Sequence, residues 1–241
     1  MDDRYRAQTM LKQIGPGGQR RLAGASVAVV GAGGLGSPAL TYLAAAGVGR
    51  LGLIDPDTVS PGNLNRQFLH GERDVGRPKA ASAKEALAAI NSGIRIVAHE
   101  ALLSDQNAGA LLSGYDLVLG AVDSFETRFV INRAARALRL PYIDGGVDGF
   151  SGCVMFSHPP KTPCLQCVFP SGGAKKKPVG VLGATAGVVG ALEANLALLW
   201  LLGLRNPLEH TLLLYDGLRM RIDPVGIKRD KNCPVCGGGA V

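Results

Sequence analysis

The segment at residues 31–36, Gly-Ala-Gly-Gly-Leu-Gly, constrains the fold of this chain more than any other feature. It follows the apolar run at residues 27–30 and opens a helical pattern, and Asp55 ends the next apolar run, at residues 51–54. A buried strand, a glycine turn that begins a helix and an acid at the end of the second strand are typical of a nucleotide site. Glycines let the backbone approach a phosphate, free amides at the helix start face it, and the acid accepts a ribose hydroxyl. The pattern predicts nucleotide contacts from Gly31, Gly33, Gly34, Gly36 and Asp55.

Strand-like and helix-like segments alternate along the first part of the chain. We expect strands at residues 26–30, 51–55, 94–98, 116–120 and 141–144, and helices at 35–47, 78–91, 105–112 and 126–138. This alternation predicts an α/β fold with a Rossmann-like, mostly parallel sheet covered by helices on both faces. Ligands bind beyond the carboxyl ends of such strands, so Gly31, Asp55 and Asp123 are expected around one crevice.

The pattern changes after residue 146. We expect a strand at residues 153–156, a loop at 159–177, a helix at 184–203, and strands at 211–215 and 219–225 that extend the sheet. The chain is therefore divided into an N-terminal helical arm, residues 1–25, and a single domain at 26–241 with halves at 26–146 and 147–241. Within the arm, Gly15-Pro16-Gly17-Gly18 is expected to interrupt an amphipathic segment before a short helix at 19–22.

Composition favours an α/β protein with an anionic partner. The 241 residues are 46% hydrophobic but only 5% aromatic, which suits helices and parallel strands built from Ala, Val and Leu. The net charge of +7 favours an anionic partner without identifying it. Basic residues are not interleaved with aromatic ones, so the lysines at 175–177 are interpreted as a solvated loop, and no nucleic-acid partner is expected.

The apolar stretch at residues 180–204 approaches membrane-spanning length. Its Gly and Ala content and its internal Glu193 favour a buried core helix. Residues 1–5 lack the apolar core of a signal peptide. We therefore expect a cytoplasmic protein that does not enter a membrane.

Four of the five cysteines form two C-x-x-C pairs, Cys164 with Cys167 and Cys233 with Cys236. Each pair on a tight turn offers two thiolates at tetrahedral spacing, so two pairs complete a closed structural zinc site with no position left for water. A redox C-x-x-C, which needs only one pair, and coincidence are the alternatives. Cys153 lies in an expected strand and is interpreted as a buried, inert thiol.

Polar residues downstream of the glycine turn indicate which nucleotide binds. Asn63 and Arg66 lie in the long loop after Asp55, and Lys79 opens the next helix. Arg66 and Lys79 supply charge for more phosphates than a glycine turn neutralises, which suits a triphosphate. Asp123 follows a strand and could hold Mg²⁺ near the phosphates.

Each of these residues also has a simpler interpretation. Arg66 and Lys79 could be solvated surface cations, and Asp123 could cap the following helix. A nicotinamide-dependent oxidoreductase would also carry the glycine turn and Asp55. An oxidoreductase would not explain why Arg66, Lys79 and Asp123 occur together.

In order and spacing, these motifs resemble the HesA/MoeB/ThiF group of the ubiquitin-activating-enzyme superfamily over nearly the whole chain. The matching segments are residues 31–36, 55–59 (Asp-Pro-Asp-Thr-Val), 63–67 (Asn-Leu-Asn-Arg-Gln), 76–79 (Gly-Arg-Pro-Lys), 122–124 (Val-Asp-Ser) and both cysteine pairs. The resemblance implies an ATP-dependent adenylyltransferase acting on the C-terminal glycine of a ubiquitin-like sulfur carrier of the MoaD/ThiS type. Pyrophosphate leaves, and the acyl-adenylate stays bound for sulfur transfer in the biosynthesis of a cofactor such as molybdopterin or thiamine.

The resemblance also implies roles for individual residues. Asp55 would bind the ribose, Asn63 and Arg66 the phosphates, Lys79 the phosphates and the developing charge, and Asp123 Mg²⁺. Arg66, Lys79 and Asp123 are therefore the candidate catalytic residues.

The same motifs place Gln67 and Ser124 among the nucleotide-binding residues. The family binds zinc with its four cysteines, forms homodimers and receives the carrier's Gly-Gly tail on its C-terminal half, here 147–241.

This chain departs from the family pattern at two places. Residues 4–8 read Arg-Tyr-Arg-Ala-Gln, with Ala7 where the family places an arginine in the partner subunit's ATP site. Either Arg6 substitutes for that arginine, or the chain is a catalytically impaired scaffold. The loop at 171–177 has no cysteine for a covalent bond to the carrier, and no rhodanese-like domain is expected, so the sulfur donor is a separate protein.

Overall fold

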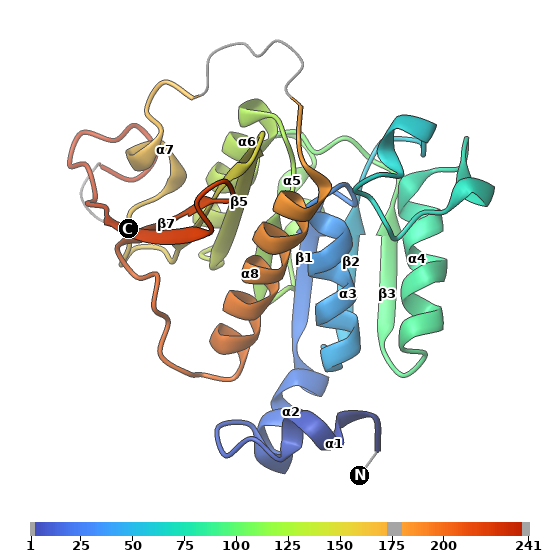
Figure 1. The fold of residues 1–241 in the computed structure, drawn as a ribbon. Coiled ribbons are helices and arrows are strands. Elements are labelled where there is room, and N and C mark those ends of the chain that lie inside the picture. Colours follow the sequence, from blue (N-terminus) through green and yellow to red (C-terminus); the bar gives the residue numbers. More distant parts are fainter. Residues whose placement is uncertain (1–2, 173–179, 238–241) are drawn as a thin grey trace.

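The computed structural model describes residues 3–172 and 180–237. Its centre is an eight-stranded sheet in the order β3-β2-β1-β4-β5-β6-β7-β8 (Figure 1). The strands are β1 (Ser26–Val30), β2 (Arg50–Ile54), β3 (Arg95–His99), β4 (Leu117–Gly120), β5 (Tyr142–Asp148), β6 (Ser151–Ser157), β7 (Thr211–Asp216) and β8 (Arg221–Gly226). The strands from β3 to β5 are parallel and those from β5 to β8 antiparallel. The predicted α/β class and the C-terminal extension of the sheet are confirmed.

Helices cover both faces of the sheet because alternate strand residues point in opposite directions. Val27 and Val29 of β1 join the core under α3 (Gly36–Ala46), α4 (Lys79–Ile90) and α8 (Gly183–Leu201). Ala28 and Val30 join the core under α5 (Ala108–Leu112), α6 (Phe125–Ala137) and α7 (Leu165–Val168). Burial on both faces explains why these strands are apolar throughout.

The N-terminal arm contains η1 (Asp3–Tyr5), α1 (Arg6–Thr9) and α2 (Gly15–Gly24). The prediction that residues 15–18 interrupt the helix was wrong. Pro16 lies in the first turn of α2, where backbone N–H groups have no partner within the helix, so the missing N–H of proline costs no hydrogen bond. Gln8 and Gln19 each donate to the Ala46 carbonyl at the end of α3, at 2.9 and 3.0 Å. The arm thus docks at the opposite end of α3 from the glycine turn (Figure 1).

The helix expected at 105–112 is shorter than predicted. Its first residues form a turn in which the Asn107 side chain accepts from the Ser104 amide at 2.8 Å, so α5 begins only at Ala108. In the loop at 56–77 the structure adds two short 3-10 helices, η2 (Pro61–Asn63) and η3 (Glu72–Asp74).

Helix α8 is the one described helix long and apolar enough to cross a membrane, by length and composition. Within the fold it packs against α3 and the sheet, and 44% of its most apolar 18-residue stretch is buried. Glu193 lies within it and is fully buried. One face of α8 therefore lies in the core, and the rest of the helix is partly exposed.

Candidate nucleotide site and cysteine cluster

A cavity of about 1020 Å³ opens at the carboxyl ends of the parallel strands. It lies where the chain order reverses beside β1, the position at which open α/β sheets bind ligands. The predicted residues that line it are Gly31, Gly33, Gly34, Asp55, Arg66, Gln67, Lys79, Asp123 and Ser124. Gly36 and Asn63 are not among the described lining residues.

The glycine turn depends on glycine at its first and last positions. Gly31 has φ of +100°, and an added Cβ would lie 2.5 Å from the Ala121 carbonyl oxygen. A Cβ at Gly36 would lie 2.0 Å from the Gly31 carbonyl oxygen. Gly36 therefore packs directly against the Gly31 carbonyl, and the turn residues Gly33, Gly34 and Leu35, which precede α3, line the cavity.

Asp55 ties the glycine turn to the end of β2. Its Oδ2 accepts from the Ala32 amide at 2.7 Å and its Oδ1 from the Asp57 amide at 2.9 Å. Burial raises the pKa of this carboxyl, against the opposing effects of the two amides and Lys79. Asp55 lines the cavity, and each of its oxygens can accept further hydrogen bonds.

The two predicted phosphate-binding cations reach the cavity from different elements. Lys79 begins α4, and its Nζ lies 2.8 Å from Asp57 Oδ2. Arg66 donates to the Gly62 carbonyl at 3.0 Å and to Asn65 Oδ1 at 2.9 Å, and its stem lies over Gly34. Both cations therefore line the same cavity as the glycine turn.

The side-chain oxygen of Asn63 makes local hydrogen bonds within its own loop. Its Oδ1 accepts from the amide and the hydroxyl of Ser60, at 3.2 and 3.0 Å, which closes the turn that carries Arg66. Gln67 does line the cavity, beside Gly33.

Asp123 and Ser124 lie between β4 and α6. Ser124 caps the helix by accepting from the Thr127 amide at 3.1 Å, so the alternative that Asp123 is the cap was wrong. Asp123 is exposed and lines the cavity. A carboxylate beside a phosphate site fits Mg²⁺, which is typically held by one or two carboxylates and substrate phosphates.

A buried ion pair in the cavity wall was missed by the sequence analysis. Arg128 forms a two-bond pair with Asp144, whose carboxylate also accepts from the Tyr142 hydroxyl. The guanidinium lies over the Phe125 ring, 4.3 Å from its centroid. Asp144 ends the strand expected at residues 141–144, much as Asp55 ends the strand expected at 51–55, and this position was the available signal.

Glu193 of α8 lies near this pair and is fully buried. Its carboxyl oxygens have no hydrogen-bond partner among the described residues. Burial, and then the Asp144 charge, raise its pKa well above the ordinary value.

The four cysteines of the two pairs converge, with all Sγ atoms within 4.8 Å of one another. Cys164 lies 3.9 Å from Cys167 and 3.6 Å from Cys233, and Cys167 lies 3.2 Å from Cys236. A tetrahedron of Zn–S bonds of about 2.3 Å has edges of about 3.8 Å. The cluster therefore fits a structural zinc site and joins residues on both sides of α8.

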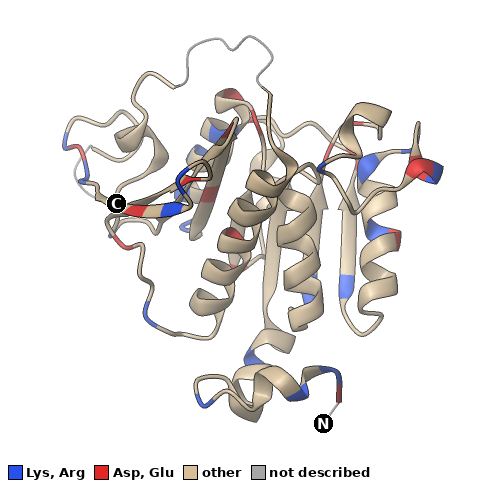
Figure 2. Cartoon of the chain, viewed as in Figure 1, with Lys and Arg blue, Asp and Glu red and all other residues tan. Residues whose placement is uncertain are grey.

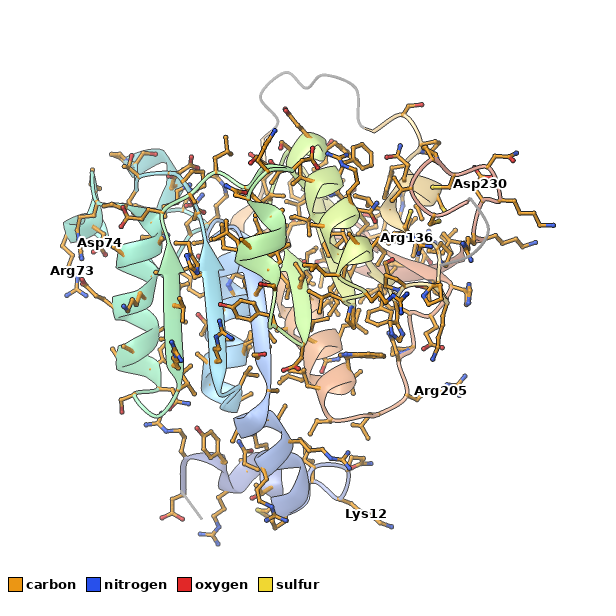
Figure 3. The ribbon with its side chains drawn as sticks, turned by 180° about the vertical axis from the view of Figure 1, so that it is seen from behind. Lys12, Arg73, Asp74, Arg136, Arg205 and Asp230 are labelled. Carbon is orange, nitrogen blue, oxygen red and sulfur yellow. The ribbon has the colours of Figure 1, made fainter. Side chains whose placement is uncertain are left out.

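Helix α6 connects this cluster to the cavity. Asn132 accepts from the Leu165 amide at 3.0 Å, and Arg136 donates to the Val235 carbonyl at 3.1 Å. Asp230, whose amide donates to Cys167 Sγ at 3.4 Å, lies on the same side of the molecule as Arg136 (Figure 3).

Cys153 was expected to be buried, but it is half-buried and lines the cavity. Burial raises the pKa of its thiol to about 11, which keeps it protonated at neutral pH, as expected for an inert thiol. The lysines at 175–177 lie outside the described residues.

Known proteins resemble this chain over nearly its full length. The ThiF family matches residues 5–235. A sulfur carrier protein adenylyltransferase of Thermus thermophilus is 45% identical over 245 residues, which cover 98% of this chain and 90% of that protein. The SAMP-activating enzyme E1 of Haloferax volcanii is 38% identical over 244 residues, covering 99% of this chain and 90% of that enzyme.

A longer relative and a solved structure extend the comparison. Adenylyltransferase and sulfurtransferase MOCS3 of Mus musculus is 41% identical over 240 residues, which cover 97% of this chain but 52% of that protein. The crystal structure of E. coli MccB with ATP is 25% identical, with a TM-score of 0.85, and the match covers 98% of this chain and 75% of that one. From its match to the family and its identity with these relatives, this chain belongs to the ThiF family.

Proposed function

We propose that this protein is an ATP-dependent adenylyltransferase that activates the C-terminal glycine of a ubiquitin-like sulfur carrier. The single observation that carries this proposal is the cavity that combines the glycine turn and Asp55 with Arg66, Lys79 and Asp123. The names of its relatives, including a sulfur carrier protein adenylyltransferase, agree with that chemistry. Carriers of this kind serve sulfur transfer in cofactor biosynthesis, such as that of molybdopterin or thiamine.

The reaction needs no side-chain nucleophile. A carboxylate oxygen of the carrier attacks the α-phosphorus of ATP, the bond to the bridging oxygen breaks, and pyrophosphate leaves with that electron pair. Positioning and neutralisation of charge supply the catalysis. Arg66 and Lys79 bind the phosphates, with Lys79 exchanging Asp57 for the charge that develops. Gln67 and Ser124 border the nucleotide, and Asp55 holds the ribose.

Asp123 is the residue that would hold Mg²⁺. The ion, when bound, neutralises charge on the phosphates that face it. Asn63 acts on the phosphates through Arg66, because it closes the turn on which Arg66 is carried.

The remaining part of the cavity suits an extended peptide tail. It is lined by Val147, Ser151, Gly152 and Cys153 of β5 and β6, and by Phe169 after α7. Small residues on these strands leave room for a Gly-Gly terminus next to the nucleotide. We therefore assign nucleotide binding to residues 26–146, and carrier binding and zinc to residues 147–241, with residues 1–25 as an arm.

We also propose that the enzyme is a homodimer. Helices α3 and α8 are nearly free of charged residues (Figure 2). Tyr42 of α3 and Leu198 of α8 are among the residues that line a groove of about 360 Å³. The arm is held at the far end of α3, 11 residues or about 16 Å of helix from the glycine turn. Arg6 is exposed on this arm, so a contact between Arg6 and phosphate would be made across the dimer, in place of the family's arginine at Ala7.

We further propose that the enzyme is soluble and cytoplasmic. Glu193 and the packing of α8 against α3 support a core helix instead of a membrane span. The half-buried Cys153, with its protonated thiol, is unsuited to a covalent bond with the carrier, which supports a separate sulfur donor.

Ligand stabilisation distinguishes this function from the oxidoreductase alternative. A ligand that binds only the folded state raises the unfolding temperature. ATP with Mg²⁺ is expected to raise it, and NAD at the same concentration is not. Stabilisation by NAD alone would contradict the proposal.

A further inference from the structure

His70 is buried directly behind the glycine turn and has no role in the reaction described above. It is 5% exposed and lies in the loop between Asp55 and α4. Its Nε2 is 3.1 Å from the Ala32 carbonyl oxygen, and its Nδ1 is 2.9 Å from Ser82 Oγ in α4. Ala32 is fully buried, so its carbonyl depends on His70 for a donor.

The chemistry of the two contacts assigns the protons of the ring. A carbonyl oxygen only accepts, so Nε2 carries the proton and donates to Ala32. Nδ1 then accepts from the Ser82 hydroxyl. Burial, together with the nearby Lys79 ammonium, lowers the pKa of His70 and favours this neutral form, although the bond to the Ala32 carbonyl, Asp55 and Asp74 act in the opposite direction.

The Ala32 carbonyl belongs to the same peptide group as the Gly33 amide. In a trans peptide the carbonyl and the N–H point in opposite directions. Holding the carbonyl toward His70 therefore turns the Gly33 N–H away from His70, and Gly33 lines the cavity. Among the described residues none accepts a hydrogen bond from this amide.

The neighbouring peptide group is fixed from the other side. The Ala32 amide donates to Asp55 Oδ2 at 2.7 Å. Asp55 and His70 thus hold two successive peptide groups of the turn, and Ser82 anchors the imidazole to α4. A flexible glycine-rich turn loses conformational entropy when a ligand orders it. Because two of its peptide groups are already fixed, this turn pays less of that cost on binding.

We propose that His70 is a positioning residue for the nucleotide: by holding the Ala32 carbonyl, it aims the Gly33 amide at the phosphates of ATP. This inference rests on the proposed function, because it takes the ligand of the turn to be ATP. An amide oriented in advance binds an anion without the cost of ordering the turn.

Calorimetric titration with ATP and Mg²⁺ tests the proposal on three variants of the full chain. His70→Leu removes the donor and is expected to weaken ATP binding roughly tenfold, the effect of one lost hydrogen bond to a buried acceptor. His70→Gln, whose amide can donate in place of Nε2, is expected to retain most of the affinity. Leu87→Ala removes a buried side chain from the same helix as Ser82 and is expected to lower the unfolding temperature with ATP affinity unchanged.

Equal ATP affinity in His70→Leu and the wild type would overturn the proposal. So would an equal loss of affinity in Leu87→Ala, since the loss would then reflect general destabilisation. Nitrogen NMR of the wild-type imidazole provides a measurement that needs no variant: the Nε2–H form of His70 is expected, and the Nδ1–H form would overturn the proposal. A wild-type chain that does not bind ATP would instead refute the proposed function, and this inference with it.

Discussion

Lys79 Nζ lies 2.8 Å from Asp57 Oδ2, although 7% of the lysine side chain is exposed against 64% of the aspartate side chain. The ammonium is therefore largely removed from water before any phosphate arrives. A desolvated cation interacts more strongly with an incoming anion than a solvated one. This pair holds Lys79 in the wall of the cavity that contains the glycine turn.

Replacing Lys79 should abolish most of the adenylylation activity. Lys79→Met is expected to lower the rate about 100-fold or more, the typical effect of losing one group that stabilises developing charge. The measurement is carrier-dependent pyrophosphate exchange at saturating ATP. Lys84→Met, an exposed lysine in the same helix, is the matched control and should retain the wild-type rate. Equal rates in the two variants would show that Lys79 has no role in the reaction.

Breaking the buried pair of Arg128 and Asp144 should destabilise the fold. Asp144→Ala leaves a guanidinium without its partner and is expected to cost about 3–5 kcal/mol in the free energy of unfolding. Asp105→Ala breaks the surface pair with Arg133 and is expected to cost less than about 1 kcal/mol. Denaturant unfolding measures both, and similar values for the two variants would contradict the assigned burial.

Glu193 should make the stability depend on pH. Its pKa is raised in the folded protein, so the folded state keeps a proton that the unfolded chain releases above about 4.5. Stability is then lost as pH rises, because the unfolded state binds fewer protons. The advantage of Glu193→Gln over the wild type should grow by up to about 1.4 kcal/mol per pH unit between the two pKa values.

Unfolding titrations from pH 4 to pH 9 measure this difference. Glu209→Gln is the exposed control and should follow the wild type at each pH. If Glu193→Gln also follows the wild type, Glu193 is ionised in the folded protein.

Loss of the cysteine cluster should remove zinc and stability together. Cys233→Ser is expected to bind no zinc and to lower the unfolding temperature by about 5 °C or more, since a structural metal contributes directly to folding. Cys153→Ser, outside the cluster, should keep one zinc ion per chain. Full zinc content in Cys233→Ser would show that the metal is held elsewhere.

The parts of the site that depend on short sequence motifs could be predicted from the sequence. Gly31, Asp55 and Asp123 follow apolar strands, and parallel strands bring their carboxyl ends to one edge, so their meeting at the cavity could be foreseen. The convergence of the two cysteine pairs could also be predicted, because two C-x-x-C pairs are typical of a zinc site.

Other parts of the site depend on tertiary burial, which a sequence pattern does not report. His70 and Glu193 look like ordinary loop and helix residues, and only the fold places them in contact with the glycine turn and with Gly145. Arg128 pairs with Asp144, which lies 16 residues away in the sequence. Asn63 was predicted to bind phosphate; its side-chain oxygen accepts from Ser60, which leaves its amide donors for that role, and it is not among the described residues that line the cavity.

Pyrophosphate exchange into ATP tests the central claim most directly. We expect exchange with this chain, Mg²⁺ and a ubiquitin-like carrier that ends in Gly-Gly, and none with the same carrier lacking its last glycine. Asp123→Ala and Arg66→Ala should lose the exchange while their zinc content stays that of the wild type. The absence of carrier-dependent exchange in the wild-type enzyme, in the presence of bound ATP and an intact Gly-Gly carrier, would contradict the account.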